Sequence, residues 1–244
     1  MANLRFFTNS PLAINTSLQL SENAAAHATR ALRLDAGDSA IVFNGDGFDY
    51  ECTLTSVKKN SVTVKVMNAT AIHNESPLNI TLLQAISSGD RMDFTIQKAV
   101  ELGVKNIQPI TSQRSVVKLS AERAEKRTEH WQNVAISACE QSGRAWVPHV
   151  ATPLSLQNWL GQNPKNDASR ILLNPIGAKR LSEFAKPASE IQLLIGAEGG
   201  LSKEEIELAA SHGFQSIVLG PRILRTETAA LTAISAMQLL WGDF

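Results

Sequence analysis

The chain lacks the features of membrane, secreted and metal-binding proteins. Its 244 residues include only two cysteines, Cys52 and Cys139, which form neither a CxxC pair nor another metal-ligand spacing. We therefore expect free thiols in a reducing compartment. The histidines also lack ligand spacing, so we expect no metal. No apolar run is long enough to span a bilayer, and the first ten residues lack the pattern of a secretory signal. These absences favour a cytoplasmic protein with no membrane partner.

An excess of charge of either sign is also missing. Lysine plus arginine and aspartate plus glutamate both total 23, which gives a formal net charge of zero. This balance counts mildly against a dedicated nucleic-acid binder, which usually has a basic surface, although local basic patches remain possible. The hydrophobic content of 43% and charged content of 19% are typical of a globular protein with a real core.

The first 70 or so residues read mostly as short strands. Asn44 to Gly47 is a strong hairpin turn. After it, every second residue from Phe48 to Leu54 is apolar, which predicts a strand with one buried face, and Val62 to Val66 alternate in the same way. These strands suggest a small barrel or compact sheet. The other elements expected here are strands at residues 4–7 and 39–43 and a helix at residues 21–34, capped by Ser21.

A polar segment that ends at Pro77 marks a change of pattern, so we predict domains at residues 1–72 and 73–244. Beyond it, strands alternate with helices, which predicts a largely parallel sheet flanked by helices. The expected strands lie at residues 80–86, 104–110, 171–173, 191–195 and 217–219. The expected helices lie at residues 90–102, 121–142, 202–212 and 227–241, and residues 157–169 are interpreted as a surface connection.

Two glycine-containing loops near the C-terminus each follow a predicted strand. The first is Gly196 to Gly200, and the second begins at Gly220. Open α/β sheets bind ligands where such loops meet, and glycine lets the backbone approach a ligand closely. A tight structural turn explains the first loop equally well. Neither loop is a Walker motif or GxGxxG, so neither a nucleoside triphosphate nor a dinucleotide is indicated.

The second loop carries more polar residues than a turn needs. Thr226 as an N-cap and Glu227 as a first-turn acid have a structural interpretation, but Arg222 and Arg225 do not. We therefore favour a functional site here. Between the loops, Ser202 and Glu205 form a capping box, which we interpret as structural. The last helix is apolar almost all round, which is typical of a helix buried in a core or an interface.

Many residues, in the two loops and outside them, share one family's pattern. They are Leu194-Ile195-Gly196-x-Glu198-Gly199-Gly200, Leu219-Gly220-x-Arg222-Ile223-Leu224-Arg225-x-Glu227-Thr228-Ala229, Gln84-Ala85, Asp90-Arg91-Met92-Asp93, Lys98-Ala99-Val100-Glu101-Leu102-Gly103, Ser115-Val116, Ala138-x-Glu140-Gln141-Ser142-Gly143-Arg144, His27, Leu32-Arg33 and Gly37-Asp38. On these residues the chain resembles the RsmE family, bacterial 16S ribosomal RNA uridine-N3 methyltransferases of the SPOUT class. One departure is Ala197, where the family usually has proline.

The resemblance implies an N-terminal PUA-like β-barrel that helps hold RNA. It also implies a C-terminal SPOUT α/β domain with a trefoil knot that binds S-adenosylmethionine, a homodimer, and ribosomal RNA or the small ribosomal subunit as partner. A sulfonium methyl is already activated, so no metal is required. Three alternatives stay open: a SPOUT methyltransferase acting on another RNA or on a ribose 2′-hydroxyl, a catalytically silent RNA-binding protein, and a small-molecule α/β enzyme.

The resemblance also suggests roles for individual residues. Arg225 and Arg222 would stabilise the uracil anion that forms when N3 loses its proton, and Glu227 or Glu198 would accept the proton or act as capping acids. The residues expected to bind the cofactor are Leu172, Asn174, Ile195, Gly196, Glu198, Gly199, Gly200, Leu219, Gly220, Ile223, Leu224, Thr226 and Thr228. The candidates for contact with RNA phosphates are Arg5, Arg30, Arg33, Arg91, Lys98, Arg114 and Arg144, each of which has a solvated surface as its alternative.

Overall fold

The computed structural model describes residues 4–115, 120–174 and 178–244, and the chain divides into two compact units. Unit 1 comprises residues 1–75 and 139–147, and unit 2 comprises residues 76–138 and 148–244. The sequence interpretation assigned residues 139–147 to the second domain, whereas the contacts group them with the first unit. Val116, one of the residues that carry the family resemblance, lies outside the described residues.

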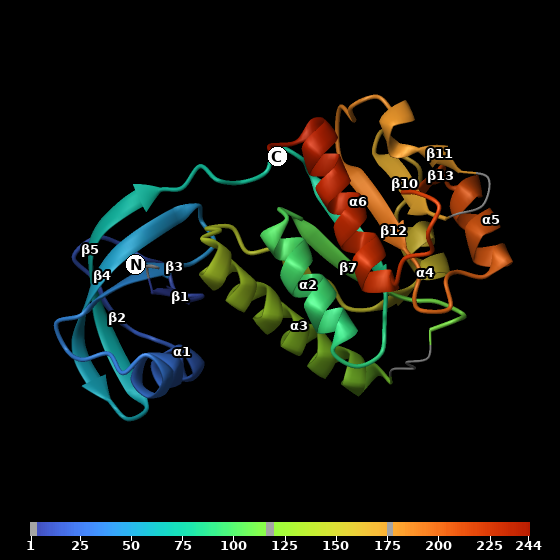
Figure 1. The fold of residues 1–244 in the computed structure, drawn as a ribbon. Coiled ribbons are helices and arrows are strands. Elements are labelled where there is room, and N and C mark those ends of the chain that lie inside the picture. Colours follow the sequence, from blue (N-terminus) through green and yellow to red (C-terminus); the bar gives the residue numbers. More distant parts are fainter. Residues whose placement is uncertain (1–3, 116–119, 175–177) are drawn as a thin grey trace. The chain divides into compact units, whose positions relative to one another are not determined.

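Unit 1 is built on a five-stranded sheet in the order β1-β3-β4-β5-β2 (Figure 1). All neighbouring pairs are antiparallel except β1 with β3. The predicted hairpin turn joins β3 to β4, and its two glycines have positive φ. The strands are β1 (Arg5–Phe7), β2 (Ser17–Gln19), β3 (Ser39–Phe43), β4 (Phe48–Lys58) and β5 (Ser61–Ala71).

The predicted buried face of β4 holds for Tyr50, Cys52 and Leu54, but it fails at the first residue of the strand. Phe48 is 40% exposed, whereas Asp49 is buried. The reason is tertiary, because the Asp49 carboxylate is paired with the buried guanidinium of Arg5. A charge at this position is covered by its partner, and the period of two cannot show that partner.

The predicted helix at residues 21–34 is shorter than expected. Ser21 caps α1 (Glu22–Ala26) by accepting a hydrogen bond from the Ala24 amide, as predicted, and a π-helical turn, η1 (His27–Ala31), follows. Arg33 then adopts φ +54°, a left-handed conformation that ends the helix. The helical spacing of the last residues therefore overestimated its length.

Unit 2 contains the predicted parallel sheet, in the order β11-β13-β10-β12-β6-β7-β8 with β9 also paired to β7. Every pairing is parallel, and all five residues of the central strand β12 are buried. The strands are β6 (Ile80–Ala85), β7 (Asn106–Thr111), β8 (His149–Val150), β9 (Leu154–Ser155), β10 (Ser169–Leu173), β11 (Lys179–Arg180), β12 (Ile191–Ile195) and β13 (Gln215–Val218).

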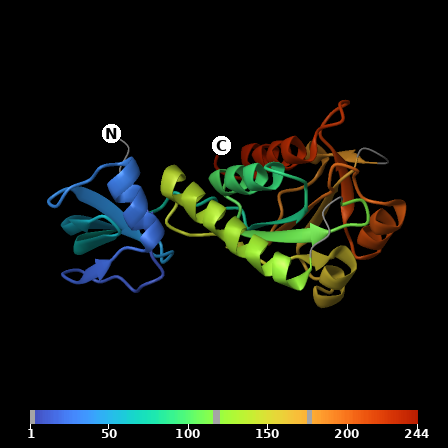
Figure 2. The same ribbon diagram turned by 90° about the horizontal axis from the view of Figure 1, so that it is seen from below.

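Helices cover both faces of this sheet. α2 and α6 lie side by side (Figures 1 and 2), and α4 and α5 share one core with strand residues such as Leu83, Leu172 and Leu194. α4 corrects the interpretation of residues 157–169 as a surface connection, because Trp159 and Leu160 are buried. The helices are α2 (Arg91–Glu101), α3 (Ala121–Ser142), α4 (Leu156–Gln162), the 3-10 turn η2 (Leu181–Glu183), α5 (Lys203–Ser211) and α6 (Thr226–Trp241).

Candidate cofactor site at the carboxyl edge of the parallel sheet

The two glycine-containing loops follow strands that are nearly adjacent in the sheet. β13, β10 and β12 are parallel neighbours, so the loops after them leave the same edge. The chain runs from β6 to β7 and later returns to the other side of β6, which makes this edge a topological switch point. Leu172 and Asn174, at the end of β10 between the two loops, are both buried. The predicted meeting of the two loops therefore follows from the sheet order.

The first loop is a tight turn in which glycine is required. The Gly200 amide donates a 2.8 Å hydrogen bond to the Ala197 carbonyl. A Cβ on Gly196 would lie 2.9 Å from the Gly200 carbonyl carbon, and Gly200 itself has φ +68°. Ala197, at the position where the related family usually has proline, is buried and closes this turn through its carbonyl. No atom lies within 4 Å of the position of a Cβ on Gly200, so one side of the loop is open.

Glu198 fastens the first loop to the segment that follows β6. Its Oε1 accepts hydrogen bonds from the Ser88 amide at 2.9 Å, the Ser88 hydroxyl at 2.8 Å and Nη1 of Arg91 at 2.8 Å. Partial burial alone would raise the pKa of Glu198, but these hydrogen bonds hold the pKa at about 2. A carboxylate with so low a pKa is a poor proton acceptor at neutral pH. The geometry thus gives Glu198 a structural role.

The segment after β7 holds the same loop from another direction. Nη1 of Arg114 donates to the Gly199 carbonyl at 3.1 Å. One carboxylate oxygen of Glu205 accepts a 2.8 Å hydrogen bond from the Ser202 amide, which confirms the predicted capping box. The other oxygen accepts a 2.8 Å hydrogen bond from the Gln113 amide. Residues from three segments of unit 2 therefore fix the loop, and a rigid loop can present a preformed binding surface.

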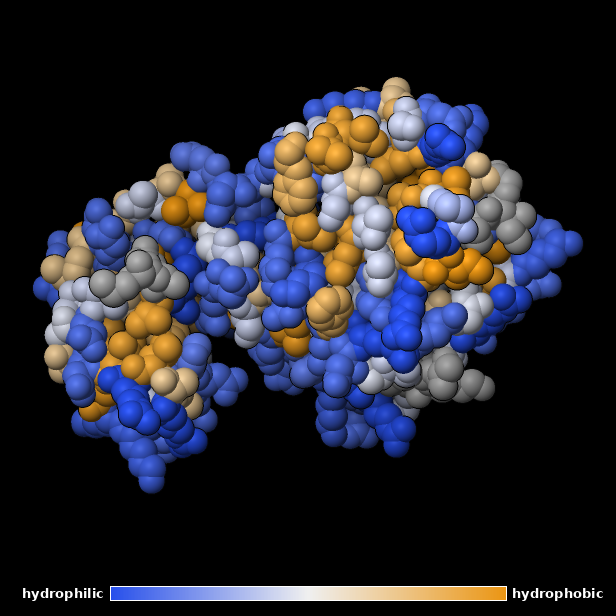
Figure 3. Space-filling view, viewed as in Figure 1, coloured by the Kyte–Doolittle hydropathy of each residue, from blue (hydrophilic) through white to orange (hydrophobic). Residues whose placement is uncertain are grey.

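The second loop is exposed. Gly220, Arg222 and Arg225 are exposed, and Ile223 is 91% exposed. Gly220 has φ +146° with no atom within 4 Å of a Cβ position. Figure 3 shows hydrophobic side chains gathered on one face of unit 2, with strongly hydrophilic ones among them. Two exposed cations beside an open glycine suit a ligand that is anionic or becomes anionic.

The start of α6 differs from the structural interpretation of the sequence. Arg225 is the N-cap residue, and it makes no side-chain cap hydrogen bond. Thr226 is the first helical residue, and its hydroxyl donates to the Gly196 carbonyl at 2.6 Å. The prediction of Thr226 as N-cap was therefore wrong, because a tertiary acceptor takes its hydroxyl. Glu227 does lie in the first turn, and its Oε2 is buried with no hydrogen-bond partner.

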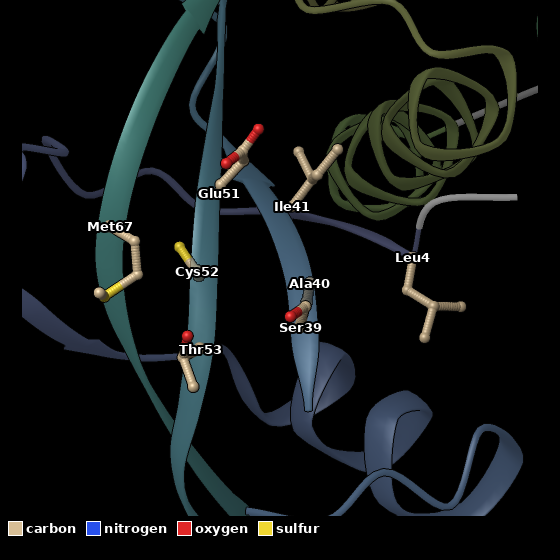
Figure 4. A pocket seen from close by; sticks show the side chains of 8 residues that line it. All are labelled: Leu4, Ser39, Ala40, Ile41, Glu51, Cys52, Thr53 and Met67. Atoms are coloured by element: carbon tan, nitrogen blue, oxygen red, sulfur yellow. The ribbon is translucent and has the colours of Figure 1, made fainter. Parts of the chain in front are cut away.

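A pocket of about 290 Å³ lies in unit 1 (Figure 4). It is lined by residues of β3, β4 and β5, and its polar groups come from Ser39, Glu51, Cys52 and Thr53. Burial raises the pKa of the Cys52 thiol to about 11, so that thiol stays protonated at neutral pH. With a carboxylate and no cation in its lining, this pocket does not suit an RNA phosphate.

Comparison with known proteins identifies the family. Residues 74–238 match the model of an RNA methyltransferase domain, and residues 20–67 match that of an RNA methyltransferase PUA domain. The chain is 33% identical to ribosomal RNA small subunit methyltransferase E of Buchnera aphidicola (subsp. Acyrthosiphon pisum) over 98% of this chain and 94% of that protein. It is 35% identical to the Bacillus subtilis protein of the same name over 89% of each chain. The chain belongs to the small subunit methyltransferase E family.

A solved methyltransferase E structure has the same fold. The enzyme from Neisseria gonorrhoeae, determined with bound S-adenosyl methionine, is 42% identical and superposes with a TM-score of 0.95 over 99% of both chains. This similarity and the PUA match establish a mixed α/β fold with a PUA-like domain. They agree with the resemblance drawn from the sequence motifs.

The chain uses several of the predicted RNA-binding cations in internal ion pairs and hydrogen bonds. Arg5 and Arg144 are buried; Arg5 pairs with Asp49, and Arg144 pairs with Glu75 at 2.5 Å. Their burial argues against contact with RNA phosphates. Lys98 pairs with Glu101 at 2.7 Å. Arg91 and Arg114 bind the first loop as described above, whereas Arg30 and Arg33 are exposed.

Sequence reasoning gave no site role to three residues that help to hold the two loops. Ser88 and Gln113 donate backbone hydrogen bonds to the carboxylates that hold the first loop, and a backbone donor leaves no mark in the sequence. Gln84 donates to Thr226 from inside β6. Its signal was visible as a buried-strand position with a polar residue, and the family pattern already included it.

Among residues 4–115, 120–174 and 178–244, no helix is long and apolar enough to cross a membrane. Over the same ranges, no group of three or more histidine, cysteine or acidic side chains is placed to hold a metal ion.

Proposed function

We propose that this protein transfers a methyl group from S-adenosylmethionine to N3 of a uridine in 16S ribosomal RNA. The observation that carries the proposal is the pair of open glycine loops at the carboxyl edge of β12 and β13. Its support is the similarity over 99% of the chain to a methyltransferase E bound to S-adenosyl methionine.

The residues at this edge fit the cofactor. A nucleoside needs close backbone contacts and an apolar floor, and the loops at Gly196–Gly200 and Leu219–Leu224 offer both. Bound there, S-adenosylmethionine supplies an activated methyl group on its sulfonium. The residues that we propose to line the site are Leu172, Asn174, Ile195, Gly196, Glu198, Gly199, Gly200, Leu219, Gly220, Ile223, Leu224, Thr226 and Thr228, with Glu198 and Thr226 acting by holding the loops.

The chain's own contribution to the reaction is to orient the uracil and manage its proton. Uridine N3 must lose a proton before or during methyl transfer. We assign the stabilisation of the resulting anion to the exposed guanidinium groups of Arg225 and Arg222. Glu227 follows Arg225 by two residues. We assign it as the proton acceptor, because its Oε2 has no hydrogen-bond partner. Glu198 is the weaker choice because of its low pKa.

The RNA is proposed to contact exposed cations on each unit. In unit 1 these are Arg30 and Arg33, in a region that overlaps the PUA match. In unit 2, Lys179 and Arg180 form β11, which pairs with β13 directly before the second loop. Both are exposed, and none of Lys179, Arg180, Arg222 and Arg225 has an ion pair within the described part of the chain. Such cations suit phosphate contacts.

The finer features of the family complete the proposal. We propose a PUA-like barrel for residues 1–72, a trefoil-knotted SPOUT domain for residues 73–244, and a homodimer. Leu239 and Leu240 of α6 are 70% and 46% exposed, which supports an interface on that helix. A ribosomal RNA substrate would place the protein in the cytoplasm, and the chemistry needs no metal.

One experiment tests the proposed reaction. The protein and labelled S-adenosylmethionine are incubated with small ribosomal subunits, and separately with free 16S RNA, from a strain that lacks the endogenous enzyme. Mass spectrometry then maps the modified base. Label at N3 of one uridine supports the proposal. Label on a ribose hydroxyl or on another RNA supports a different SPOUT activity, and cofactor binding without any transfer supports a silent RNA-binding protein.

A further inference from the structure

Gln84 is a buried amide in the strand that borders the cofactor site. It lies in β6, and its side chain is 0% exposed. Its Nε2 donates hydrogen bonds to the Ala85 carbonyl at 3.0 Å and to Oγ1 of Thr226 at 2.9 Å. Its Oε1 is buried and has no hydrogen-bond partner. The amide is thus held as a donor, while its acceptor is left unused.

This arrangement fixes the direction of the Thr226 hydroxyl. A hydroxyl has one hydrogen, and a backbone carbonyl can only accept. Because Oγ1 of Thr226 accepts from Gln84, its own hydrogen is free for the Gly196 carbonyl, 2.6 Å away. The three groups therefore form a one-way relay in which each hydrogen bond polarises the next.

The relay joins the two loops of the site. Gly196 is the first residue of one loop, and Thr226 begins α6, which follows the other loop. The hydrogen bond between them holds the Gly196 carbonyl toward α6 and sets the spacing of the loops. We propose that Gln84 is a positioning residue for the methyl-donor site, acting through Thr226 on Gly196. The inference rests on the proposed function, since it takes these two loops to hold S-adenosylmethionine.

A purely structural role explains Gln84 less well. An unpaired buried acceptor is unfavourable, so an apolar side chain of similar length would suit this strand better if stability alone mattered. Gln108, in the neighbouring strand β7, offers a comparison within the chain. Its Nε2 also donates two hydrogen bonds, but both go to backbone carbonyls, those of Pro109 at 2.9 Å and Thr152 at 3.0 Å. Neither of these acceptors belongs to the two loops, so Gln108 serves as a matched control.

Calorimetric titration with S-adenosylmethionine tests the relay in the full-length protein. Gln84→Met and Thr226→Val each remove one link, and each is expected to weaken binding about tenfold, the effect of one well-placed hydrogen bond. The double variant should bind no more weakly than about the Thr226→Val variant alone, because both changes break one chain. Thr226→Ser keeps the hydroxyl and should restore binding. Gln108→Met should bind like the wild type.

Each other outcome overturns the inference. Wild-type affinity in Gln84→Met would show that the relay does not position the loops. Equal losses in Gln84→Met and Gln108→Met, or in Thr226→Ser and Thr226→Val, would assign the effect to packing. If Gln84→Met does not fold, as judged by circular dichroism, Gln84→Leu takes its place, and wild-type affinity in that variant overturns the inference in the same way. A wild-type protein that does not bind S-adenosylmethionine would refute the proposed function itself, a failure distinct from wild-type binding with an unaffected variant.

Discussion

Oε1 of Glu198 accepts a 2.8 Å hydrogen bond from Nη1 of Arg91, a residue 107 positions earlier in the chain. The same oxygen also accepts hydrogen bonds from the backbone amide and the hydroxyl of Ser88. Three donors on one carboxylate oxygen hold the first glycine loop against the start of α2. Glu198 belongs to the family motif and was a candidate proton acceptor. Its hydrogen bonds instead give it the role of holding the first loop in place.

Glu198→Gln should weaken the attachment of the first loop to the start of α2. The amide keeps the shape of the side chain but loses the charge that attracts Arg91, so we expect binding of S-adenosylmethionine to weaken about tenfold. Stability at neutral pH should fall by about 1 kcal/mol, after allowance for the partial exposure of the pair. Calorimetry and urea unfolding measure the two effects. Glu207→Gln on α5, whose pair with Lys203 is exposed, is the control and should change neither.

The pH dependence of stability gives a second test of the role of Glu198. The folded-state pKa of Glu198 is lowered to about 2 from an ordinary 4.5. A lowered pKa means that the stabilisation is present above pH 4.5 and is lost as the pH falls toward 2. The stability difference between wild type and Glu198→Gln should therefore be constant near neutral pH and shrink below pH 4.5. A difference that does not change across that window would contradict the role of the ionised carboxylate.

The sequence predicted the site where local rules decide the structure. Glycines after apolar runs marked both loops, and the capping box at Ser202 and Glu205 marked the start of α5. The predicted strand at residues 191–195 and helix at residues 121–142 match the structure end to end. These features depend on spacing over a few residues, which one sequence contains.

Tertiary pairing explains what the sequence could not predict. The sequence suggested that Arg5 and Arg144 are surface cations. In the structure both are buried, and each pairs with a carboxylate, 44 and 69 positions away in the chain respectively. Arg170, in β10, is also buried; its guanidinium donates to the Asn163 and His212 carbonyls, near the ends of α4 and α5. No periodicity reveals which distant partner satisfies a charge. The fate of each cation therefore required the structure.

Gly196→Ala should damage the site without removing any functional group. The new Cβ would lie 2.9 Å from the Gly200 carbonyl carbon, and backbone cannot yield as a side chain does. We expect a loss of about 2 kcal/mol in stability and a marked loss of cofactor binding. Gly161→Ala in α4 is the matched control, since no atom lies within 4 Å of its Cβ position, and alanine there should stabilise by about 0.5 kcal/mol. Equal effects of the two substitutions would show that the first loop is not closed as described.

Lys179→Gln combined with Arg180→Gln should weaken RNA binding in a salt-dependent way. If both cations contact phosphates, the negative slope of log affinity against log salt concentration should become shallower by about 1.4 to 1.8, the value for two lost contacts. Filter binding to 16S RNA at several salt concentrations measures it. Arg123→Gln with Lys126→Gln removes two exposed cations from α3 and is the control. The same change of slope in both double variants would indicate a general charge effect and no defined contact surface at β11.

Arg225→Ala separates catalysis from cofactor binding. Arg225 is exposed at the N-cap of α6, with no side-chain cap hydrogen bond, so its removal should leave the loops and their hydrogen bonds in place. If its guanidinium stabilises the uracil anion, methylation should fall by about a hundredfold or more, whereas affinity for S-adenosylmethionine should change less than about threefold. Single-turnover methylation assays and calorimetry give the two numbers, with Arg123→Ala on α3 as a control for charge. Parallel losses of transfer and cofactor affinity would instead make Arg225 a structural part of the second loop, because an interaction made only in the transition state does not alter binding of the donor.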